Sequence, residues 1–239
     1  MPLQLRNDQI LVNGYTAKII RTSRRKTASI KVSEGKVSII VPESLSTDKI
    51  ESLLAKKSRW IKDKLTLHED TATLKTNEFV SGEAFSYLGR NYRLKVVKGL
   101  YPSITFHQGR FVASVMNLTV NNQPAIKQLL IRWYKQHAEA KLIEKTQRYA
   151  KILGLSPSSV GIKTYQSRWG GCSQSGEIYY NWKIIMAPNC IVDYVVIHEL
   201  CHIKHHNHSQ VFWALLESYC PDYSDSKEWL KLNGNRLDI

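Results

Sequence analysis

The sequence lacks the features that mark membrane and secreted proteins. It contains no apolar run of about 18 residues, so it predicts no transmembrane helix. Residues 1–6 lack the apolar core of a signal peptide. No cysteine pair has C-x-x-C spacing, and free thiols in a reducing compartment are the expectation for Cys172, Cys190, Cys201 and Cys220. We therefore expect a cytoplasmic protein without membrane contact.

Acidic residues are also scarce. The chain has 34 Lys and Arg against 20 Asp and Glu, a formal charge of +14. Residues 1–120 carry 20 basic and 10 acidic side chains, and residues 121–239 carry 14 and 10. The excess in the first half indicates an acidic partner such as DNA or another nucleic acid, or simply a basic surface. The candidate phosphate contacts are clustered at Arg21, Arg24, Arg25 and Lys26, although a solvated loop would have the same composition.

The first half reads as strands with one helix. Asn13-Gly14 and Ser33-Glu34-Gly35 each separate two apolar strand patterns, which predicts two hairpins. A helix is expected from Asp48 to Leu65, and glycine-punctuated strands of a small antiparallel sheet follow over residues 78–120. No internal repeat is strong enough to name. We place the domain boundary at residues 121–124, between a strand-rich basic domain (1–120) and a second domain (121–239).

The second half predicts helices around short strands. A long helix runs from Pro124 to about Leu153, and strands follow over 160–166, 168–172 and 178–184. The last strand is a candidate for binding an extended peptide as an added strand, which makes its central residues candidate substrate contacts: Tyr180, Asn181 and Trp182. The fold class is thus α+β, with a strand-rich N-terminal domain before a helical domain that carries a small antiparallel sheet.

The chemistry is concentrated in one run, His198-Glu199-Leu200-Cys201-His202, which follows an apolar helical stretch. Residues four apart share one face of a helix, so His198 and His202 can hold one metal ion between them. Glu199 can reach a water on that metal without ligating it. An H-E-x-x-H run of this kind is typical of zinc metalloproteases.

A third ligand is predicted at His208, six residues after His202. On a continuous helix that ring would point about 80° away from the face of His198, so the helix must end at residues 205–207. Three alternatives stay open for the ligand set: a His202–His206 pair, or a carboxylate from Glu217 or Glu228. The candidate oxyanion donors are Tyr194, Arg168 and Tyr219.

Three stretches together resemble one family. They are Arg168-Trp169-Gly170-Gly171-Cys172, the helix from Asp193 to His202, and Asn207-His208-Ser209 with Phe212-Trp213. With these residues the chain resembles the YgjP-like metallopeptidases, relatives of the SprT zinc proteases, some of which act on proteins crosslinked to DNA. Gly171 departs from the family, which more often has Ser there. The resemblance implies a zincin-like fold, one zinc ion per chain on His198, His202 and His208, and Glu199 as the catalytic carboxylate.

These observations predict a zinc metallopeptidase that hydrolyses peptide bonds in proteins, a candidate for acting on nucleic-acid-associated proteins. Two other classes stay open. Some metal-dependent ribonucleases share the histidine spacing, but their first histidine is not typically followed by Glu. A non-catalytic nucleic-acid-binding module with a structural zinc would require a fourth protein ligand.

Overall fold

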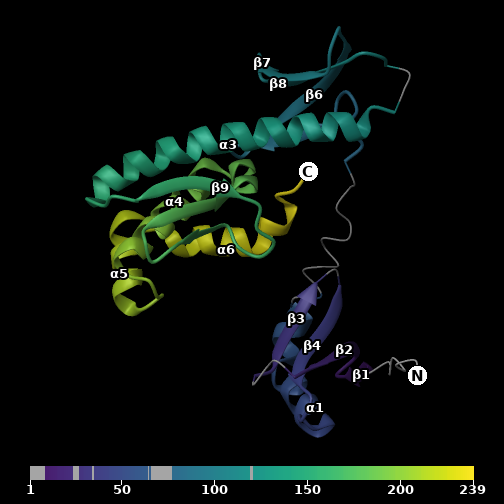
Figure 1. Cartoon of the computed structure of the whole chain (residues 1–239), viewed down its shortest axis with the longest axis vertical. Helices are drawn as coiled ribbons and strands as arrows, with labels where there is room; N and C mark the ends of the chain where they lie inside the picture. Colours follow the sequence, from purple (N-terminus) through teal and green to yellow (C-terminus); the bar gives the residue numbers. More distant parts are fainter. Residues whose placement is uncertain (1–8, 24–26, 34, 64, 66–76, 119–120) are drawn as a thin grey trace. The chain divides into compact units, whose positions relative to one another are not determined.

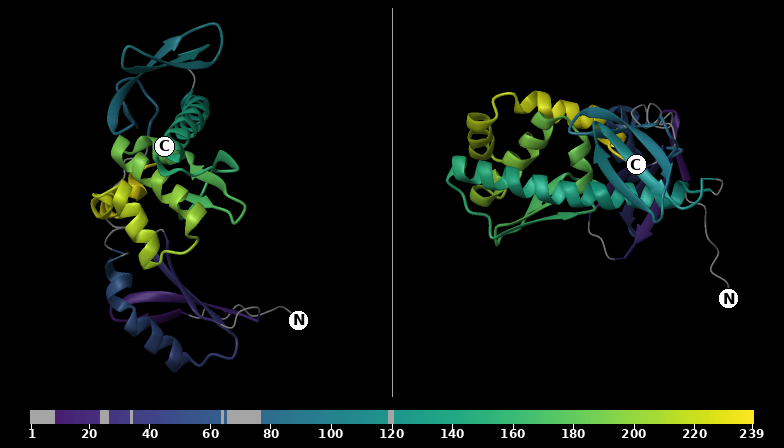
Figure 2. Two further views of the ribbon diagram at one scale, coloured as in Figure 1. Left: turned by 90° about the vertical axis from the view of Figure 1, so that its left-hand side faces the viewer. Right: turned by 90° about the horizontal axis from the view of Figure 1, so that it is seen from above.

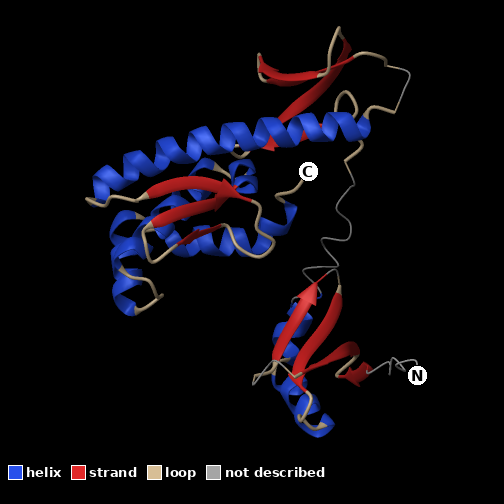
Figure 3. Cartoon of the chain, in the orientation of Figure 1, coloured by secondary structure: helices blue, strands red, loops and turns tan. Residues whose placement is uncertain are grey.

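A computed structural model describes residues 9–23, 27–33, 35–63, 65, 77–118 and 121–239 (Figure 1). The chain forms two compact units, residues 1–75 and residues 76–239. Both combine strands with helices, and the α+β class, strand-rich first and helical afterwards, is confirmed (Figure 3). The division differs from the boundary expected at 121–124, because the second sheet packs into one apolar core with the helices that follow it.

Unit 1 is a four-stranded sheet covered by a helix. Its strands are β1 (Gln9–Val12), β2 (Tyr15–Thr22), β3 (Ser29–Ser33) and β4 (Lys36–Pro42), in the order β1-β2-β4-β3. Helix α1 (Thr47–Lys56) follows, and residues 58–63 are helical again. Both predicted hairpins form, with Asn13 and Gly14 at positive φ in the first turn (49° and 88°). Ile50 and Leu54 of α1 pack on the sheet and are fully buried.

Unit 2 begins with a second four-stranded sheet. Its strands are β5 (Ala84–Tyr87), β6 (Arg90–Lys98), β7 (Ser103–His107) and β8 (Arg110–Val115), in the order β5-β6-β8-β7. Strands β6 and β8 pair in parallel, so the expectation of an antiparallel sheet over residues 78–120 is wrong for this central pair. Trp133 and Tyr134 of helix α3 (Gln123–Leu153) pack against the sheet.

The two sheets are copies of one plan. Both consist of two hairpins joined by a central parallel pair, β2–β4 in one and β6–β8 in the other, and each is followed by a helix. When the closing pairs of the second hairpins are matched, Ser33–Lys36 with His107–Arg110, the buried strand positions coincide: Val37 with Phe111, Ile39 with Ala113 and Val41 with Val115. This repeat was not recognised from the sequence because what is shared is burial and register, while residue identities differ.

The rest of unit 2 surrounds one buried helix. A sheet of β9 (Ser159–Lys163), β10 (Gly170–Cys172) and β11 (Glu177–Asn181) has the order β10-β11-β9 and is mixed, since β9 and β11 are parallel. The 3-10 helix η1 (Trp182–Met186) occupies positions that were expected to continue a strand. Helix α4 (Asn189–Lys204) contacts α3, β10, α5 (Gln210–Tyr219) and α6 (Tyr223–Asn233), and η2 (Gly234–Arg236) lies near the C-terminus (Figure 2).

The buried helix α4 is held by a polar contact as well as by apolar packing. Lys145 of α3 is buried and donates to the carboxylate of Asp193 on α4 at 2.5 Å. Val192, Val196 and Leu200 are completely buried on the same helix. No helix among the described residues has both the length and the apolar character needed to cross a membrane.

Candidate active site

Two histidines lie one turn apart on the exposed side of α4. The ring centroids of His198 and His202 are 4.9 Å apart, as expected for side chains at positions i and i+4. Most of the helix from Ile191 to Cys201 is apolar and buried, so its backbone position is set by the core. Both rings are therefore presented to the same space by a rigid element.

His208 joins them from the turn after the helix. Helix α4 ends at Lys204, and His205 is extended (φ −134°), so the chain reverses before α5 begins at Gln210. The Nε2 atom of His208 lies 3.0 Å from Nε2 of His198. Trp213 holds this turn, because its indole N–H donates to the carbonyl of His208 and its ring stacks on the imidazole. The predicted helix end thus brings the third ring to the other two.

The three rings suit a divalent cation. One nitrogen of each of His198, His202 and His208 lies within 4.8 Å of the others. Nδ1 of His202 lies 3.0 Å from the carbonyl oxygen of His205, and an Nδ1–H donated there leaves Nε2 free as a ligand. Burial, together with the two neighbouring imidazoles, lowers the pKa of His198 to about 3. A neutral ring with an available lone pair is the form that binds a metal, so this donor set fits one.

Glu199 lies beside this group and is only 6% exposed. Burial raises the pKa of its carboxyl to about 8, and the positive charge of Arg168 acts in the opposite direction. The side chain faces Gly170 on β10, where a β-carbon would lie 2.5 Å from Oε1 and 2.7 Å from Cγ. Position 170 must therefore be glycine for the carboxylate of Glu199 to lie where it does.

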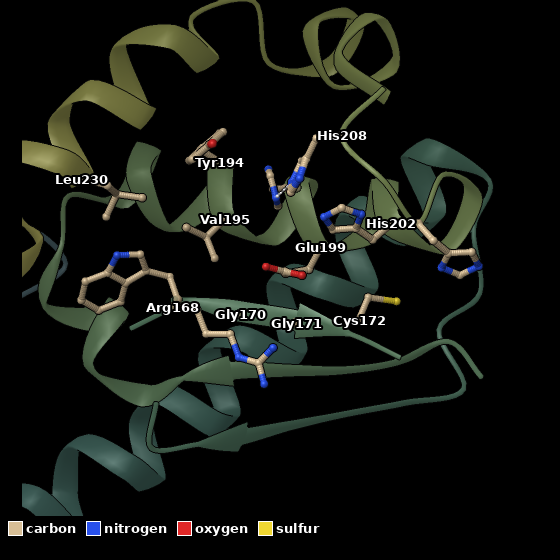
Figure 4. Close-up of a pocket in the computed structure, with 13 residues that line it drawn as sticks. Arg168, Gly170, Gly171, Cys172, Tyr194, Val195, Glu199, His202, His208 and Leu230 are labelled. Carbon is tan, nitrogen blue, oxygen red and sulfur yellow. Dashed lines mark hydrogen bonds between the residues drawn. The ribbon is translucent and has the colours of Figure 1, made fainter. Parts of the chain in front are cut away.

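These groups line one open pocket of about 470 Å³ (Figure 4). Helix α4 supplies one wall and β10 the other, so the carboxylate of Glu199 lies between the histidines and the strand. The half-buried, free thiol of Cys172 ends β10 and also lines the pocket. The lining residues are Arg168, Trp169, Gly170, Gly171, Cys172, Tyr194, Val195, His198, Glu199, His202, His206, His208 and Leu230.

The substrate contacts expected at Tyr180, Asn181 and Trp182 require correction. All three are at most 3% exposed, and β11 is the central strand of its sheet, paired on both sides. Tyr180 shares a hydrogen bond with Thr146, and Trp182 donates to Thr164. Asn181 donates to the carbonyls of Tyr165 and Arg168, so it shapes the loop that leads into β10. The prediction assumed an edge strand, and only the strand order shows that the edges are β9 and β10, of which β10 lines the pocket.

The remaining candidates fall in different places. Arg21 donates to the carbonyls of Glu43 and Leu45, which ties β2 to the segment before α1. Residues 24–26, the other members of the basic cluster, lie outside the described residues. Glu217 is exposed and Glu228 pairs with Lys231, and neither is part of the three-histidine group. His206, Tyr194 and Arg168 line the pocket, whereas Tyr219 does not.

A buried helix that presents two histidines and a glutamate, with a third histidine from the next turn, is the architecture of a metallopeptidase. The chain belongs to the YgjP-like family, whose metallopeptidase domain matches residues 26–233. Among solved structures, it is similar to the metallopeptidase zymogen abylysin from Pyrococcus abyssi. That match has 23% identity and a TM-score of 0.33, and covers 38% of this chain and 94% of that one. No curated protein matches.

Proposed function

We propose that this protein is a zinc-dependent peptidase in which His198, His202 and His208 hold one zinc ion per chain and Glu199 is the general base. The observation that carries the proposal is the convergence of three imidazoles and one buried carboxylate in a single open pocket. In the described part of the chain, no fourth His, Cys, Asp or Glu joins the three rings. Three protein ligands with an open position are typical of a catalytic zinc site, whereas structural sites are closed.

Zinc bound there would supply Lewis-acid polarisation of the scissile carbonyl and of the attacking water. Glu199 has the position to take the proton of that water on a carboxylate oxygen and to pass it to the leaving amine. Its burial keeps the carboxylate away from bulk water, which strengthens its interaction with nearby cationic groups. Without a metal ion, burial outweighs the charge of Arg168 and favours the protonated carboxyl. The ionised form that accepts the proton would therefore depend on the positive charge of bound zinc together with that of Arg168.

Tyr194 is the side chain best suited to stabilise an oxyanion. It lines the pocket on α4 one turn before His198, and burial raises its pKa to about 12, so its hydroxyl stays a donor at neutral pH. Arg168 also lines the pocket, where its positive charge acts on Glu199. Tyr194→Phe is expected to lower kcat with little change in zinc content.

The substrate we propose is a peptide or protein segment that extends along β10. This strand is an edge of its sheet and faces the histidines across the pocket, so an added strand would lie next to Glu199. The ribonuclease alternative is weaker because of Glu199. In H-E-x-x-H peptidases the glutamate after the first histidine activates the attacking water, and ribonucleases with this histidine spacing do not typically have it. This places peptide chemistry ahead of phosphodiester chemistry for the same three histidines.

Substrates associated with nucleic acid are a finer proposal, supported by the formal charge of +14. A labelled DNA duplex titrated with the full chain tests it. Replacing Arg24, Arg25 and Lys26 together by Ser is expected to weaken binding and reduce its salt dependence. Unchanged binding would show that this cluster makes no phosphate contacts. Arg21 is left intact in that experiment because it holds the fold.

Glu199→Gln in the zinc-loaded protein tests the catalytic assignment. The amide keeps the shape of the side chain but cannot accept a proton, so hydrolysis of an unfolded protein substrate should fall at least about a thousandfold with zinc retained. Glu217→Gln is the matched control, because Glu217 is exposed on α5 outside the pocket. Full activity in Glu199→Gln would refute the role of Glu199.

A further inference from the structure

Unit 1 has an open apolar groove of about 330 Å³ between β3 and the helical segment that follows β4. It is lined by Ala28, Ile30, Ile39, Leu53, Lys57 and Trp60. Leu53 is 37% exposed and Trp60 is 43% exposed, and together they give the groove an apolar wall open to solvent. Lys57 is the charged residue of the lining.

Unit 2 has a tryptophan near the corresponding edge strand that is covered by other aromatic rings. Trp133, which follows an arginine in α3 as Trp60 follows Arg59, is only 6% exposed. It packs against Phe106 of β7 and Tyr87 of β5, with ring centroids 5.7 and 5.1 Å away. The shared hairpin register puts Val32 of β3 at the position of Phe106. Unit 1 therefore lacks the aromatic side chain that covers the tryptophan in unit 2.

The helices also differ in where they meet their sheets. Helix α3 contacts β7, the edge strand of its sheet, whereas α1 contacts β1, at the edge opposite β3. A helix that lies toward β1 leaves a groove between itself and β3. The groove follows from this placement together with the smaller side chain at position 32.

The backbone beside the groove is available for pairing. Among the described strands, β3 pairs only with β4. The hydroxyl of Ser38 donates to the carbonyl of Lys31, so that carbonyl points toward β4. Because backbone groups alternate in direction along an antiparallel strand, those of Ile30 and Val32 point to the open edge. An extended chain laid there would find two residues with donors and acceptors in place.

We propose that this groove binds an extended segment of a partner protein, which adds to β3 as a strand and inserts one large apolar side chain over Trp60. The segment should carry acidic residues two positions before and after that side chain. Lys49 and Lys57 are exposed one helical turn, about 6 Å, on either side of Leu53, and alternate residues of a strand are about 7 Å apart. This peptide site is separate from the metal site and does not depend on the peptidase proposal.

The probe we would use is the fluorescein-labelled heptapeptide Thr-Glu-Thr-Phe-Thr-Glu-Thr, titrated into full-length Glu199→Gln protein to prevent cleavage. Fluorescence anisotropy should show saturable binding. Replacing Phe by Ala in the peptide should weaken binding at least about tenfold, the effect of losing a buried aromatic ring. Two further peptides carry backbone N-methyl groups, one on Phe and the two Glu residues and the other on the Thr residues next to Phe. Only one of these sets of N–H groups can face β3, so only one of the two peptides should lose binding to a comparable extent.

Two matched protein variants locate the site. Leu53→Lys places a charge in the groove wall at an already exposed position and should weaken binding at least about tenfold. Leu11→Lys makes the same change on β1, where Leu11 is 72% exposed, and should leave binding unchanged. Circular dichroism melting of both variants checks that each is folded.

Four results would overturn the proposal. The first is no binding at millimolar peptide, and the second is equal binding by Leu53→Lys. The third is protection of Trp60 from acrylamide quenching in the peptide-free full chain, judged against Trp60→Phe, which would show that the groove is already filled. The fourth is a concentration-dependent dimer abolished by Leu53→Lys, which would assign the groove to a second copy of this chain.

Discussion

Gly170 of β10 faces the side chain of Glu199 so closely that a β-carbon at position 170 would lie 2.5 Å from Oε1. The neighbouring glycine is different, since a β-carbon at Gly171 would meet Arg168 Nη1 at 3.5 Å, an ordinary contact. One glycine of the pair thus determines where the carboxylate lies, and the other tolerates a side chain. A serine at position 171 would therefore be accommodated without displacing the carboxylate.

Gly170→Ala should displace Glu199 and lower kcat about a hundredfold, because a shift of about 1 Å at a catalytic group costs that much. Zinc content should stay unchanged, since the three atoms nearest a β-carbon at position 170 all belong to Glu199. Gly171→Ala is the matched control and should retain activity within about twofold. Comparable losses in both variants, or none in Gly170→Ala, would contradict this account of the strand.

His208→Ala should weaken zinc binding at least about a hundredfold, because it removes one of three ligands. His206→Ala is the control: His206 lines the pocket but is not one of the three converging rings. Competition with a chromophoric chelator measures both affinities. Loss of zinc in His206→Ala but not in His208→Ala would transfer the third ligand to His206.

When the metal is removed by a chelator, His198 and Glu199 should change the stability of the fold with pH in opposite directions. His198 is neutral down to about pH 3 in the folded chain and titrates at an ordinary pKa of 6.5 when unfolded, so stability rises with pH through that window. Glu199 keeps its proton up to about pH 8 when folded but loses it near 4.5 when unfolded, so its contribution falls as pH rises from 4.5 to 8.

The melting temperature of the chelated protein should therefore be highest between about pH 4.5 and 6.5 and decline above it. Glu199→Gln, which cannot ionise, should lose the decline between pH 6.5 and 8. If the decline were the same in both proteins, another group would be responsible for it. Thermal scans in one buffer series are sufficient to decide.

Asp193→Asn should destabilise the fold by about 3 kcal/mol, because it leaves the charge of Lys145 buried without a counterion. Replacing both residues, as in Lys145→Met with Asp193→Leu, should cost less than Asp193→Asn alone. Glu144→Gln is the control on α3. It removes the acidic partner of Lys141 in an exposed ion pair and should leave the free energy of unfolding unchanged. Urea unfolding measures all three.

Local sequence was sufficient to predict that His198, His202 and His208 come together. The spacing of His198 and His202 places both rings on one helical face, and the polar residues after Lys204 indicated the helix end that returns His208 to them. The Asn13-Gly14 turn could also be predicted from the sequence, because both residues readily adopt positive φ. Such features depend on a few consecutive residues and on the periodicity of a single element.

Tertiary structure decided which strand borders the pocket and which groove stays open. The stretch with Tyr180, Asn181 and Trp182 was predicted to accept an added peptide strand. Instead, β11 is paired on both sides, and the edge strand that borders the pocket is β10. Likewise, the exposure of Trp60 depends on where α1 meets its sheet, and the repeat with unit 2 is visible only in register and burial. Sheet order and helix placement are determined by contacts between residues distant in sequence, which local periodicity does not encode.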